Sequence, residues 1–390
     1  MTMLSQQQRI FFEFLRFCIG TVQEVPSSLK GADWRALYAM ARKQCLVGVL
    51  FDGIKRLPAD VGMDKGLLFQ WMAQNQTLRK ANARLDKAAV EVAEWFGRKG
   101  FRTCVLKGQG NALLYPPGME RTPGDIDLWV DGGDRKVVSF VRSLSPDEKV
   151  CYHHIGFPEY NGVEVEVHFR PSFLFCFRHN RRLQGYYERV MDEQFAHRVK
   201  LGEQGEVAVP KAEFNLIFQL THIFTHLMNE GIGLRQLLDY FFLLKNTDFI
   251  GNADGDGFLL NTDCTDNTDK DGGNADGVDR RLLQDELRRL GLWEFAGAVM
   301  YIMKEVFGLE DNRLIVPPDV KRGRLVLKEV LEAGNFGQYD KRNWFGHSAL
   351  GHNLQRLYRD MRLVRYFPEE ALSEPFFRIW HFFWRKRIVR

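Results

Sequence analysis

Residues 124–130, GDIDLWV, constrain the fold of this chain more than any other segment. Side chains two positions apart share one face of a strand, so Asp125 and Asp127 point the same way, with Cα atoms roughly 6.5–7 Å apart. The intervening apolar residues point the other way and can anchor the strand in a core. Two neighbouring carboxylates repel each other in a cleft, and a divalent cation such as Mg²⁺ removes that cost. The alternative is a strand whose solvent-facing side happens to carry two aspartates, although Asp is a poor strand former.

The segment VEVEVHF (163–169) predicts a second strand with the same alternation. Its valines and phenylalanine form one face, and Glu164, Glu166 and His168 form the other. If this strand lies beside the aspartate strand, Glu164 or Glu166 could complete a site of three carboxylates. On periodicity alone, an edge strand with a charged outer face is the favoured interpretation.

A turn that could bind phosphate is indicated at VLKGQG (105–110). A strand over 101–106 would end there, and Lys107 and Gly108 open a segment that looks helical. Glycine at such a turn lets backbone amides approach a phosphate, a helix N-terminus favours anions, and Lys107 adds a mobile positive charge. Any strand–glycine–helix turn in an α/β protein would look the same, so this signal is weak alone.

Most of the remaining chain is predicted to be helical. Apolar residues recur at three- and four-residue steps over 5–98, where Asp64 can begin a long helix and Gly100 can end it. The helical period returns after residue 211. We therefore predict an α+β protein with a small mixed sheet. Its regions are an N-terminal helical region (1–98), an α/β core (99–200) and a larger C-terminal helical domain (201–390).

The segment 251–280 is rich in Asp and Gly and interrupts the C-terminal helical region. It holds eight Asp against one Lys and one Arg, a net charge of −6 that leaves +10 for the rest of the chain. Because it can bury little apolar area, we predict a disordered surface insertion. Residues 252–263 fit a calcium-binding loop loosely, but tracts of this composition produce such matches by chance.

The order strand, Lys-Gly, helix, loop with Arg121, Asp-x-Asp strand, helix and Glu strand resembles the nucleotidyltransferase superfamily whose palm is like that of DNA polymerase β. More narrowly, LKGQGNALLYP, RTPGDIDLWV and VEVEVHFRP resemble an uncharacterised bacterial nucleotidyltransferase family with an LKG…R…DIDL…D/E-x-H signature. The segments THIFTHLM, GLRQLLDYFFLL and GNFG look like parts of the helical region of that family. The resemblance covers most of the chain outside residues 251–280.

This resemblance implies a metal-dependent transfer of a nucleoside monophosphate from a triphosphate such as ATP to an acceptor hydroxyl, with release of pyrophosphate. It makes Asp125, Asp127 and Glu166 the catalytic and metal-binding acids, and Mg²⁺ or Mn²⁺ the cofactor. The nucleotide-binding residues that it implies are Lys107, Gly108, Gln109 and Arg121. The acceptor could be a sugar, a small molecule or a protein. The superfamily commonly has Gly-Ser where this chain has Gly108-Gln109, which motivates the alternative of a catalytically silent nucleotide- or partner-binding protein.

His222 and His226 lie four residues apart on a predicted helix and so share a face, as zinc ligands often do. The helix is otherwise apolar, and structural histidines are the favoured interpretation. The six cysteines include no Cys-x-x-Cys pair, so a zinc module is not expected. We expect the cysteines to be reduced thiols. No motif that reads DNA or RNA is found, and sequence-specific nucleic-acid binding is not expected.

The last fifteen residues, FFRIWHFFWRKRIVR (376–390), carry five Lys or Arg and no acid. They could lie on an anionic membrane surface with their aromatic side chains inserted. A terminal helix packed on the helical domain is the preferred interpretation, because basic residues at its C-terminal end suit the helix dipole. No apolar run approaches the ~20 residues that span a bilayer, and no secretory signal is found, so a cytoplasmic protein is expected.

Overall fold

A small mixed sheet forms the α/β part of the fold. The computed structural model describes residues 4–58, 61–250, 277–342 and 349–389. In spatial order the strands are β1 (Thr103–Leu106), β2 (Ile126–Val130), β4 (Val163–His168) and β3 (His154–Tyr160). β2 and β4 are parallel, whereas β1 and β3 pair antiparallel with their neighbours at the two edges. The predicted α+β class with a small mixed sheet is confirmed.

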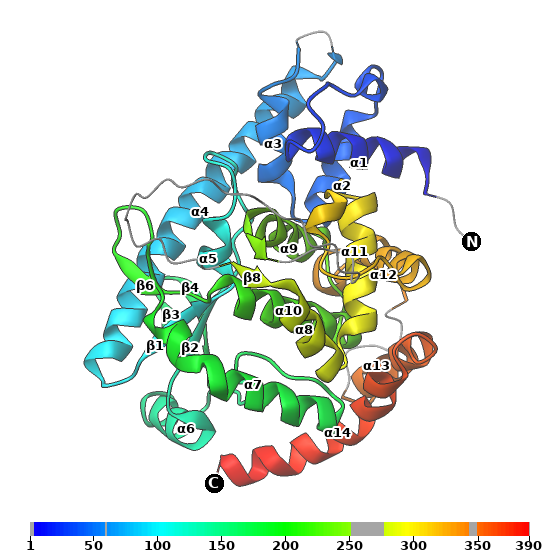
Figure 1. Ribbon diagram of the computed structural model, residues 1–390. Helices are drawn as coiled ribbons and strands as arrows, with labels where there is room; N and C mark the ends of the chain where they lie inside the picture. The colour runs from blue at the N-terminus through cyan, green and yellow to red at the C-terminus, as the bar shows by residue number, and fades with distance from the viewer. Residues whose placement is uncertain (1–3, 59–60, 251–276, 343–348, 390) are drawn as a thin grey trace, which may run out of the picture.

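One face of the sheet is covered by apolar packing. Ile126, Leu128 and Val130 are buried there, as the alternation predicts, together with the valines of β4. They pack with buried residues of α4 (Lys65–Arg98) and α6 (Gly133–Leu144). The predicted long helix is confirmed, since the Asp64 side chain accepts a hydrogen bond from the Leu67 amide at its start. Figure 1 shows α4 running past the sheet towards the N-terminal helices.

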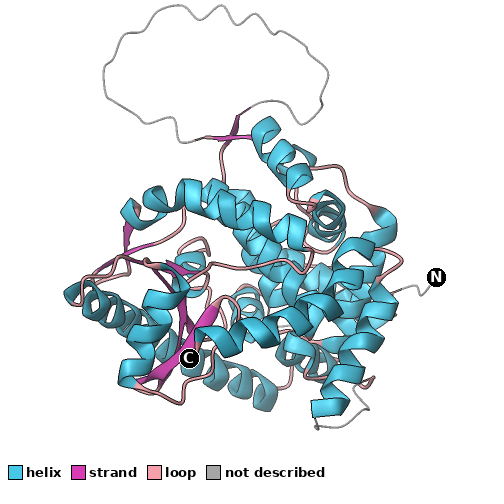
Figure 2. Cartoon of the chain, turned by 90° about the horizontal axis from the view of Figure 1, so that it is seen from below, coloured by secondary structure: helices cyan, strands magenta, loops and turns pink. Residues whose placement is uncertain are grey.

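The opposite face of the sheet looks towards the helical part of the chain. α5 (Gly108–Ala112), α7 (Phe177–Ala196), α8 (Ala212–Asn229) and α9 (Leu234–Asn246) lie on this side. α8 and α9 are buried along nearly their whole length. In the view of Figure 2 the main strands lie in the left part of the molecule with helices on both sides of them, and a separate short strand pair lies at the top.

The helices at the two ends of the chain share one hydrophobic core. Phe11 and Leu50 from the N-terminal region belong to the same cluster as Phe241 and Val330 from the C-terminal region. The helices before the sheet are α1 (Gln6–Cys18), η1 (Ser27–Leu29), α2 (Trp34–Lys43) and α3 (Val47–Ile54). Those after α9 are α10 (Arg280–Arg289), α11 (Trp293–Glu305), η3 (Asp311–Arg313), α12 (Val320–Ala333), η4 (Asn335–Gly337), α13 (Ala349–Leu363) and α14 (Pro368–Ile388). The domain boundaries at 98/99 and 200/201 stay predictions.

Two short strand pairs complete the fold. β5 (Arg198–Lys200) pairs with β6 (Glu206–Ala208), and β7 (Phe249–Ile250) pairs with β8 (Val278–Asp279). The disordered insertion predicted for 251–280 is therefore wrong for its last residues, because Val278 and Asp279 form β8 and Asp279 caps α10. Residues 251–276, which include the calcium-loop match at 252–263, lie outside the described residues.

No helix in the described part of the chain is both long and apolar enough to cross a membrane. The five described cysteines are free thiols, and Cys264 lies outside the described residues.

Candidate functional site

Two acids from separate strands meet on the face of the sheet that looks towards the helices. The parallel pairing of β2 with β4 places Asp127 directly opposite Glu166. Because alternation then sends both side chains to the same face, the two carboxylates converge with His168. One ligand atom from each of these three side chains lies within 4.8 Å of the others. The predicted convergence of the aspartate strand with Glu166 is present, and Glu164 is exposed on the same strand.

Asp127 is buried and pairs with two cations at one oxygen. Its Oδ1 lies 2.7 Å from Lys107 Nζ and 3.0 Å from His168 Nε2. Burial alone would raise the pKa of Asp127, but Lys107 and His168 hold it below its ordinary value. Burial likewise opposes the charged form of His168, yet its hydrogen bonds to Asp127 and Glu166 raise its pKa to about 9. His168 is therefore protonated at neutral pH, and its Nε2–H donates a hydrogen bond to Asp127 Oδ1.

Asp125 and Glu166 occupy different electrostatic surroundings beside this pair. The negative charge of Asp127, together with burial, raises the pKa of Asp125 to about 6. Burial opposes ionisation of Glu166, but the nearby His168 and His154 hold its pKa below the usual value. Glu166 Oε2 lies 3.3 Å from His154 Nδ1 and 3.5 Å from His168 Nε2. Crowded carboxylates with mutual repulsion are the arrangement that a bound cation relieves.

These acids line a cavity of about 340 Å³ between the sheet and helices α8, α9 and α13. That volume lies near the lower end of the range for small-molecule sites, about 300–1,000 Å³. Several cationic side chains line it as well, namely Lys107, Lys149, Arg121, Arg235 and Arg356. Acids on one wall and bases around them suit a phosphate ligand that carries a metal ion.

Lys107 and Gly108 lie at the cavity, as predicted, whereas Gln109 does not. Lys107 follows β1 with φ of 51°, and its Nζ also lies 3.3 Å from His222 Nε2. Gln109 is buried within α5 and lines a separate pocket. Successive helix residues project in different directions, so the turn that presents Lys107 carries Gln109 away. The predicted contact of Gln109 with nucleotide therefore has no support in this geometry.

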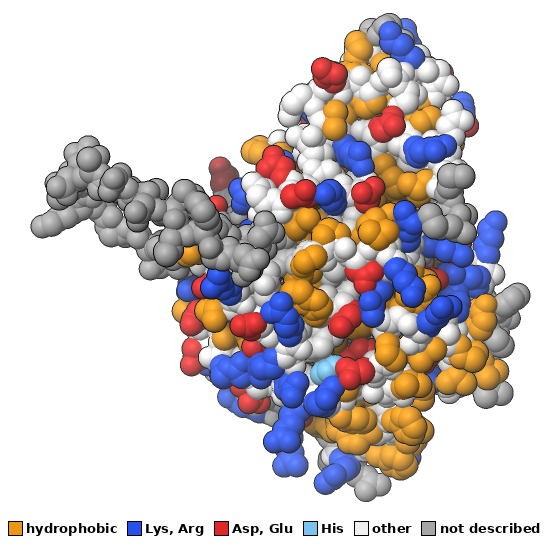
Figure 3. Space-filling view, turned by 45° about the vertical axis from the view of Figure 1, so that its right-hand side comes forward, with side chains coloured by type: hydrophobic (Ala, Val, Ile, Leu, Met, Phe, Trp, Pro, Cys, Tyr) orange, Lys and Arg blue, Asp and Glu red, His pale blue; other side chains and the backbone are white. Residues whose placement is uncertain are grey.

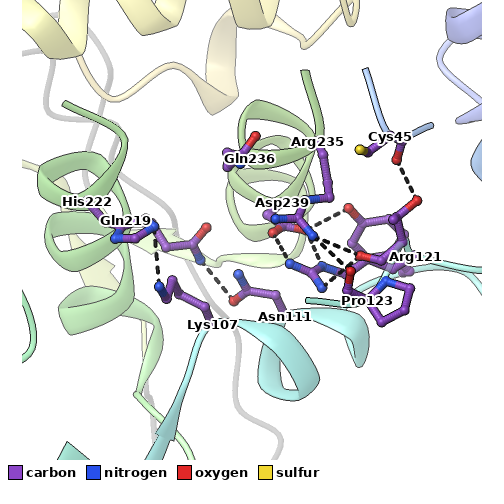
Figure 4. A network of polar contacts seen from close by, with 12 residues as sticks. Cys45, Lys107, Asn111, Arg121, Pro123, Gln219, His222, Arg235, Gln236 and Asp239 are labelled. Carbon is purple, nitrogen blue, oxygen red and sulfur yellow. Dashed lines mark hydrogen bonds and ion pairs between the residues drawn. The ribbon is translucent and has the colours of Figure 1, made fainter. Parts of the chain in front are cut away.

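Arg121 anchors the loop that leads into β2. Its guanidinium makes two hydrogen bonds of 2.7 Å to the Asp239 carboxylate on α9, and Tyr115 Oη donates a third at 2.7 Å. Figure 4 shows this network. The same loop is tied again by Thr122, whose hydroxyl donates to the Cys45 carbonyl at 2.7 Å. Arg121 borders the cavity, but its charge is already paired with Asp239. In this structure it anchors the loop before β2, and a direct contact with phosphate stays a prediction.

Arg235 is a cavity residue that no sequence pattern singled out. Its Nη1 donates to the carbonyls of Thr122 and Pro123 at 3.1 and 3.2 Å, and its Nε has no partner among the described residues. Burial and the charge of Arg121 lower its pKa. A Cβ added at Gly124 would lie 3.4 Å from Nη1, so the glycine before Asp125 leaves room for this guanidinium.

His222 and His226 both line the cavity, although neither was expected there. Burial and the charge of Lys107 hold the pKa of His222 well below its ordinary value, so it is neutral and can accept from Lys107. His226 pairs with Glu230 at 2.5 Å. In the described chain the two histidines do not join a third donor in a metal-binding group. In the sequence, the spacing of four residues placed both histidines on one side of a helix, but it did not show which part of the molecule lies opposite that side.

The donor set at the strand pair fits a divalent cation. Asp127 and Glu166 offer carboxylate oxygens, and Asp125 lines the same cavity a short distance away. Hard oxygen donors suit Mg²⁺ or Mn²⁺, and the hydrogen bond from His168 orients the Asp127 carboxylate. Lys107 occupies the Asp127 oxygen in this structure, so a cation bound there must displace it.

A helix-covered mixed sheet with acids on two adjacent strands defines a protein of nucleotidyltransferase type. A family model described as "Uncharacterised nucleotidyltransferase" matches residues 30–254. That is more than half of the chain, so the chain belongs to this family. The family supports a transferase activity in general terms.

Two further comparisons add little. The crystal structure of an antigenic nucleotidyltransferase-like protein from Paracoccidioides brasiliensis is similar over 42% of this chain and 75% of that chain, with 16% identity and a TM-score of 0.28. A comparison with curated proteins finds no match.

Proposed function

We propose that this chain transfers a nucleoside monophosphate from a nucleoside triphosphate to an acceptor hydroxyl and releases pyrophosphate. The observation that carries the proposal is the register of the parallel strands, which brings Asp127 and Glu166 together in a cavity lined by basic residues. Family membership supports the class of reaction, and the acceptor could be a sugar, a small molecule or a protein.

In this proposal Asp125, Asp127 and Glu166 hold Mg²⁺ or Mn²⁺. The bound ion would neutralise charge on the phosphate oxygens during displacement. Lys107 leaves Asp127 and moves to the triphosphate, because both partners are negatively charged and the phosphate is the more highly charged. Arg235 provides a second cation for the phosphates, and its unpartnered Nε is a free donor for that purpose.

In this proposal Glu166 accepts the proton of the attacking hydroxyl. His154 and His168 keep its pKa low and orient the carboxylate, which therefore stays ionised until it receives that proton. The acceptor oxygen forms a bond to the α-phosphorus, and the bond from that phosphorus to its bridging oxygen breaks. Pyrophosphate takes the electron pair, and Glu166 holds the proton.

The test compares Glu166→Gln with Glu164→Gln, two isosteric changes on one strand. Each purified variant is incubated with α-labelled ATP, GTP, CTP or UTP, Mg²⁺ and cell extract, and label incorporated into acceptor is measured. We expect Glu166→Gln to lose at least about a hundredfold in rate, in line with other losses of a transition-state contact, and the exposed Glu164→Gln to match wild type. Equal rates for the two variants would refute the mechanism.

One observation favours a second candidate, a binding protein without catalysis. Lys107 and His168 already neutralise Asp127, so the site is electrically balanced without a metal. Calorimetric titration separates the candidates. An enzyme is expected to bind triphosphate only with Mg²⁺ and to lose that binding in Asp125→Asn, whereas a silent protein would bind triphosphate equally with and without the ion.

A further inference from the structure

A second group of metal-ligating side chains lies where α7 meets α14, apart from the carboxylate cavity. Cys176 is the N-cap residue of α7, His179 lies in the first turn of that helix, and Glu370 comes from the first turn of α14. One ligand atom of each lies within 4.8 Å of the others. Figure 1 shows the two helices meeting at the lower part of the molecule. A thiol, an imidazole and a carboxylate form a donor set that zinc accepts.

One distance in this group fits a tetrahedral ion as well as it fits a direct hydrogen bond. His179 Nδ1 and Glu370 Oε1 are 3.3 Å apart, which is long for a bond between an imidazole and a carboxylate. Two ligands about 2.0–2.1 Å from zinc at a tetrahedral angle would be about 3.3 Å apart. The pair therefore already has the spacing of one edge of a zinc site.

Two of the three ligands, Glu370 and His179, are held by further contacts, as metal ligands usually are. Glu370 Oε2 accepts from the amides of Phe175 and Cys176 at 2.6 and 3.2 Å, which leaves Oε1 facing His179. His179 Nε2 lies 3.1 Å from Glu369 Oε2, so this carboxylate can accept a hydrogen bond from the ring nitrogen that does not bind the metal. A Cβ at Gly291 would lie 2.2 Å from the His179 ring, so only glycine admits the ring there.

We infer that Cys176, His179 and Glu370 bind one zinc ion that fastens the start of α14 to the start of α7. The thiolate and carboxylate together balance the ion's charge, and water can fill the fourth position. The expectation of no zinc module rested on the lack of Cys-x-x-Cys pairs, whereas this site uses Cys-x-x-His with a distant glutamate.

Cobalt substitution tests the site directly, because only a thiolate ligand gives an intense near-ultraviolet charge-transfer band with Co²⁺. The metal-free full-length chain is titrated with Co²⁺ alone. We expect one equivalent to produce the band in wild type and in the matched control Cys45→Ser, and no band in Cys176→Ser or His179→Gln. Circular dichroism establishes that each variant is folded.

A missing band in wild type would overturn the inference, as would a band retained in Cys176→Ser. Zinc should also displace cobalt and raise the melting temperature of wild type but not of Cys176→Ser. The carboxylate cavity contributes no thiolate to its predicted ligand set, so failure of this test leaves the proposed nucleotidyl transfer untouched.

An independent observation concerns the outer face of α14. Leu372, Phe376, Ile379 and Phe383 are each at least 60% exposed and repeat at helical spacing, so they form one stripe along the helix. Trp380 and Phe382 flank it, and Leu357 and Met361 are exposed on the neighbouring α13. Figure 3 shows hydrophobic side chains gathered in the lower part of the view, with Lys and Arg beside them.

Basic side chains border this stripe. Lys386 and Arg387 are exposed in the last turn of α14, on either side of the stripe by helical geometry. The ring of Phe177 touches Trp380 and also lines a groove of about 640 Å³ with five arginines, Arg178, Arg181, Arg182, Arg189 and Arg289. Aromatic and aliphatic side chains beside a cationic fringe match an anionic bilayer surface, whose phosphates a second protein copy would not offer.

The geometry points to an anionic lipid surface as the partner of this face. The full-length chain is sedimented with vesicles of phosphatidylcholine alone or with added phosphatidylglycerol. We expect binding only to the anionic vesicles, loss of binding in Phe376→Ser and Arg181→Glu, and no loss in Phe69→Ser, whose side chain on α4 is 64% exposed. Equal binding to both vesicles, no binding, or dimerisation through Phe376 without vesicle binding would each overturn this assignment.

Discussion

The ion pair between Arg121 and Asp239 should be essential for stability, and its removal gives a quantitative test of how the loop before Asp125 is held. Both side chains are buried, and Asp239 accepts three hydrogen bonds of 2.7 Å from Arg121 and Tyr115. In Asp239→Asn the guanidinium stays buried without its counter-charge, which typically costs about 3–5 kcal/mol. An unfolding entropy of about 2.1 cal/mol/K per residue corresponds to about 0.8 kcal/mol/K for a chain of this length, so the melting temperature should fall by roughly 4–6 °C.

The assay is thermal unfolding of wild type, Asp239→Asn and the surface control Asp285→Asn. Asp285 pairs with Arg288 on an exposed helix face, where such pairs contribute about 0–1 kcal/mol. The double variant Arg121→Met/Asp239→Leu should lose less stability than Asp239→Asn, because no unpaired charge remains. A melting temperature of Asp239→Asn within about 1 °C of wild type would refute the reasoning.

Three other perturbations are predicted from the site and its surroundings. Arg235→Lys should weaken triphosphate binding about tenfold in calorimetry, because lysine keeps the charge and loses the forked donors. Lys107→Met should bind Mn²⁺ without nucleotide more tightly than wild type, measured by electron paramagnetic resonance, since no ammonium then competes for Asp127. Burial and the charge of Glu374 raise the pKa of Asp360 to about 8. The neutral carboxyl therefore stabilises the folded state fully below the ordinary carboxyl pKa, and this contribution is lost as pH rises through about 8. The melting temperature of wild type should therefore fall more steeply between pH 6 and 9 than that of Asp360→Asn, and equal slopes would contradict this.

Local pattern was enough to predict the parts of the fold whose stabilising contacts are close in sequence. The Asp64 cap and the end of α4 follow from short-range hydrogen bonding, and the face shared by Asp125 and Asp127 follows from strand geometry. The pairing of Asp127 with Glu166 could not be derived this way, because a shift of one residue in the β2–β4 register would place different side chains opposite each other. Family resemblance supplied that step.

The residues that helices α8 and α9 contribute to the cavity could not be predicted from the sequence, for a different physical reason. α8 and α9 are buried on almost all sides, so their hydrophobic period does not mark which side chains face the site. Arg121 was the arginine expected at phosphate, because the family resemblance implies it. Its partner Asp239 lies on α9, far along the chain, and only tertiary structure reveals that Arg121 is paired while Arg235 faces the cavity.

The charges of the acids at the candidate site are balanced by neighbouring side chains of the chain itself. Asp127 and Glu166 would repel each other at the strand pair, but Lys107 and His168 supply two positive charges at the same place. The two strands can therefore pair with both carboxylates ionised and aligned. If the site binds metal and nucleotide as proposed, the two should bind interdependently, because Lys107 would give up Asp127 at low cost only when phosphate offers it another negative partner. The site should for that reason favour the ion and the triphosphate together over either alone.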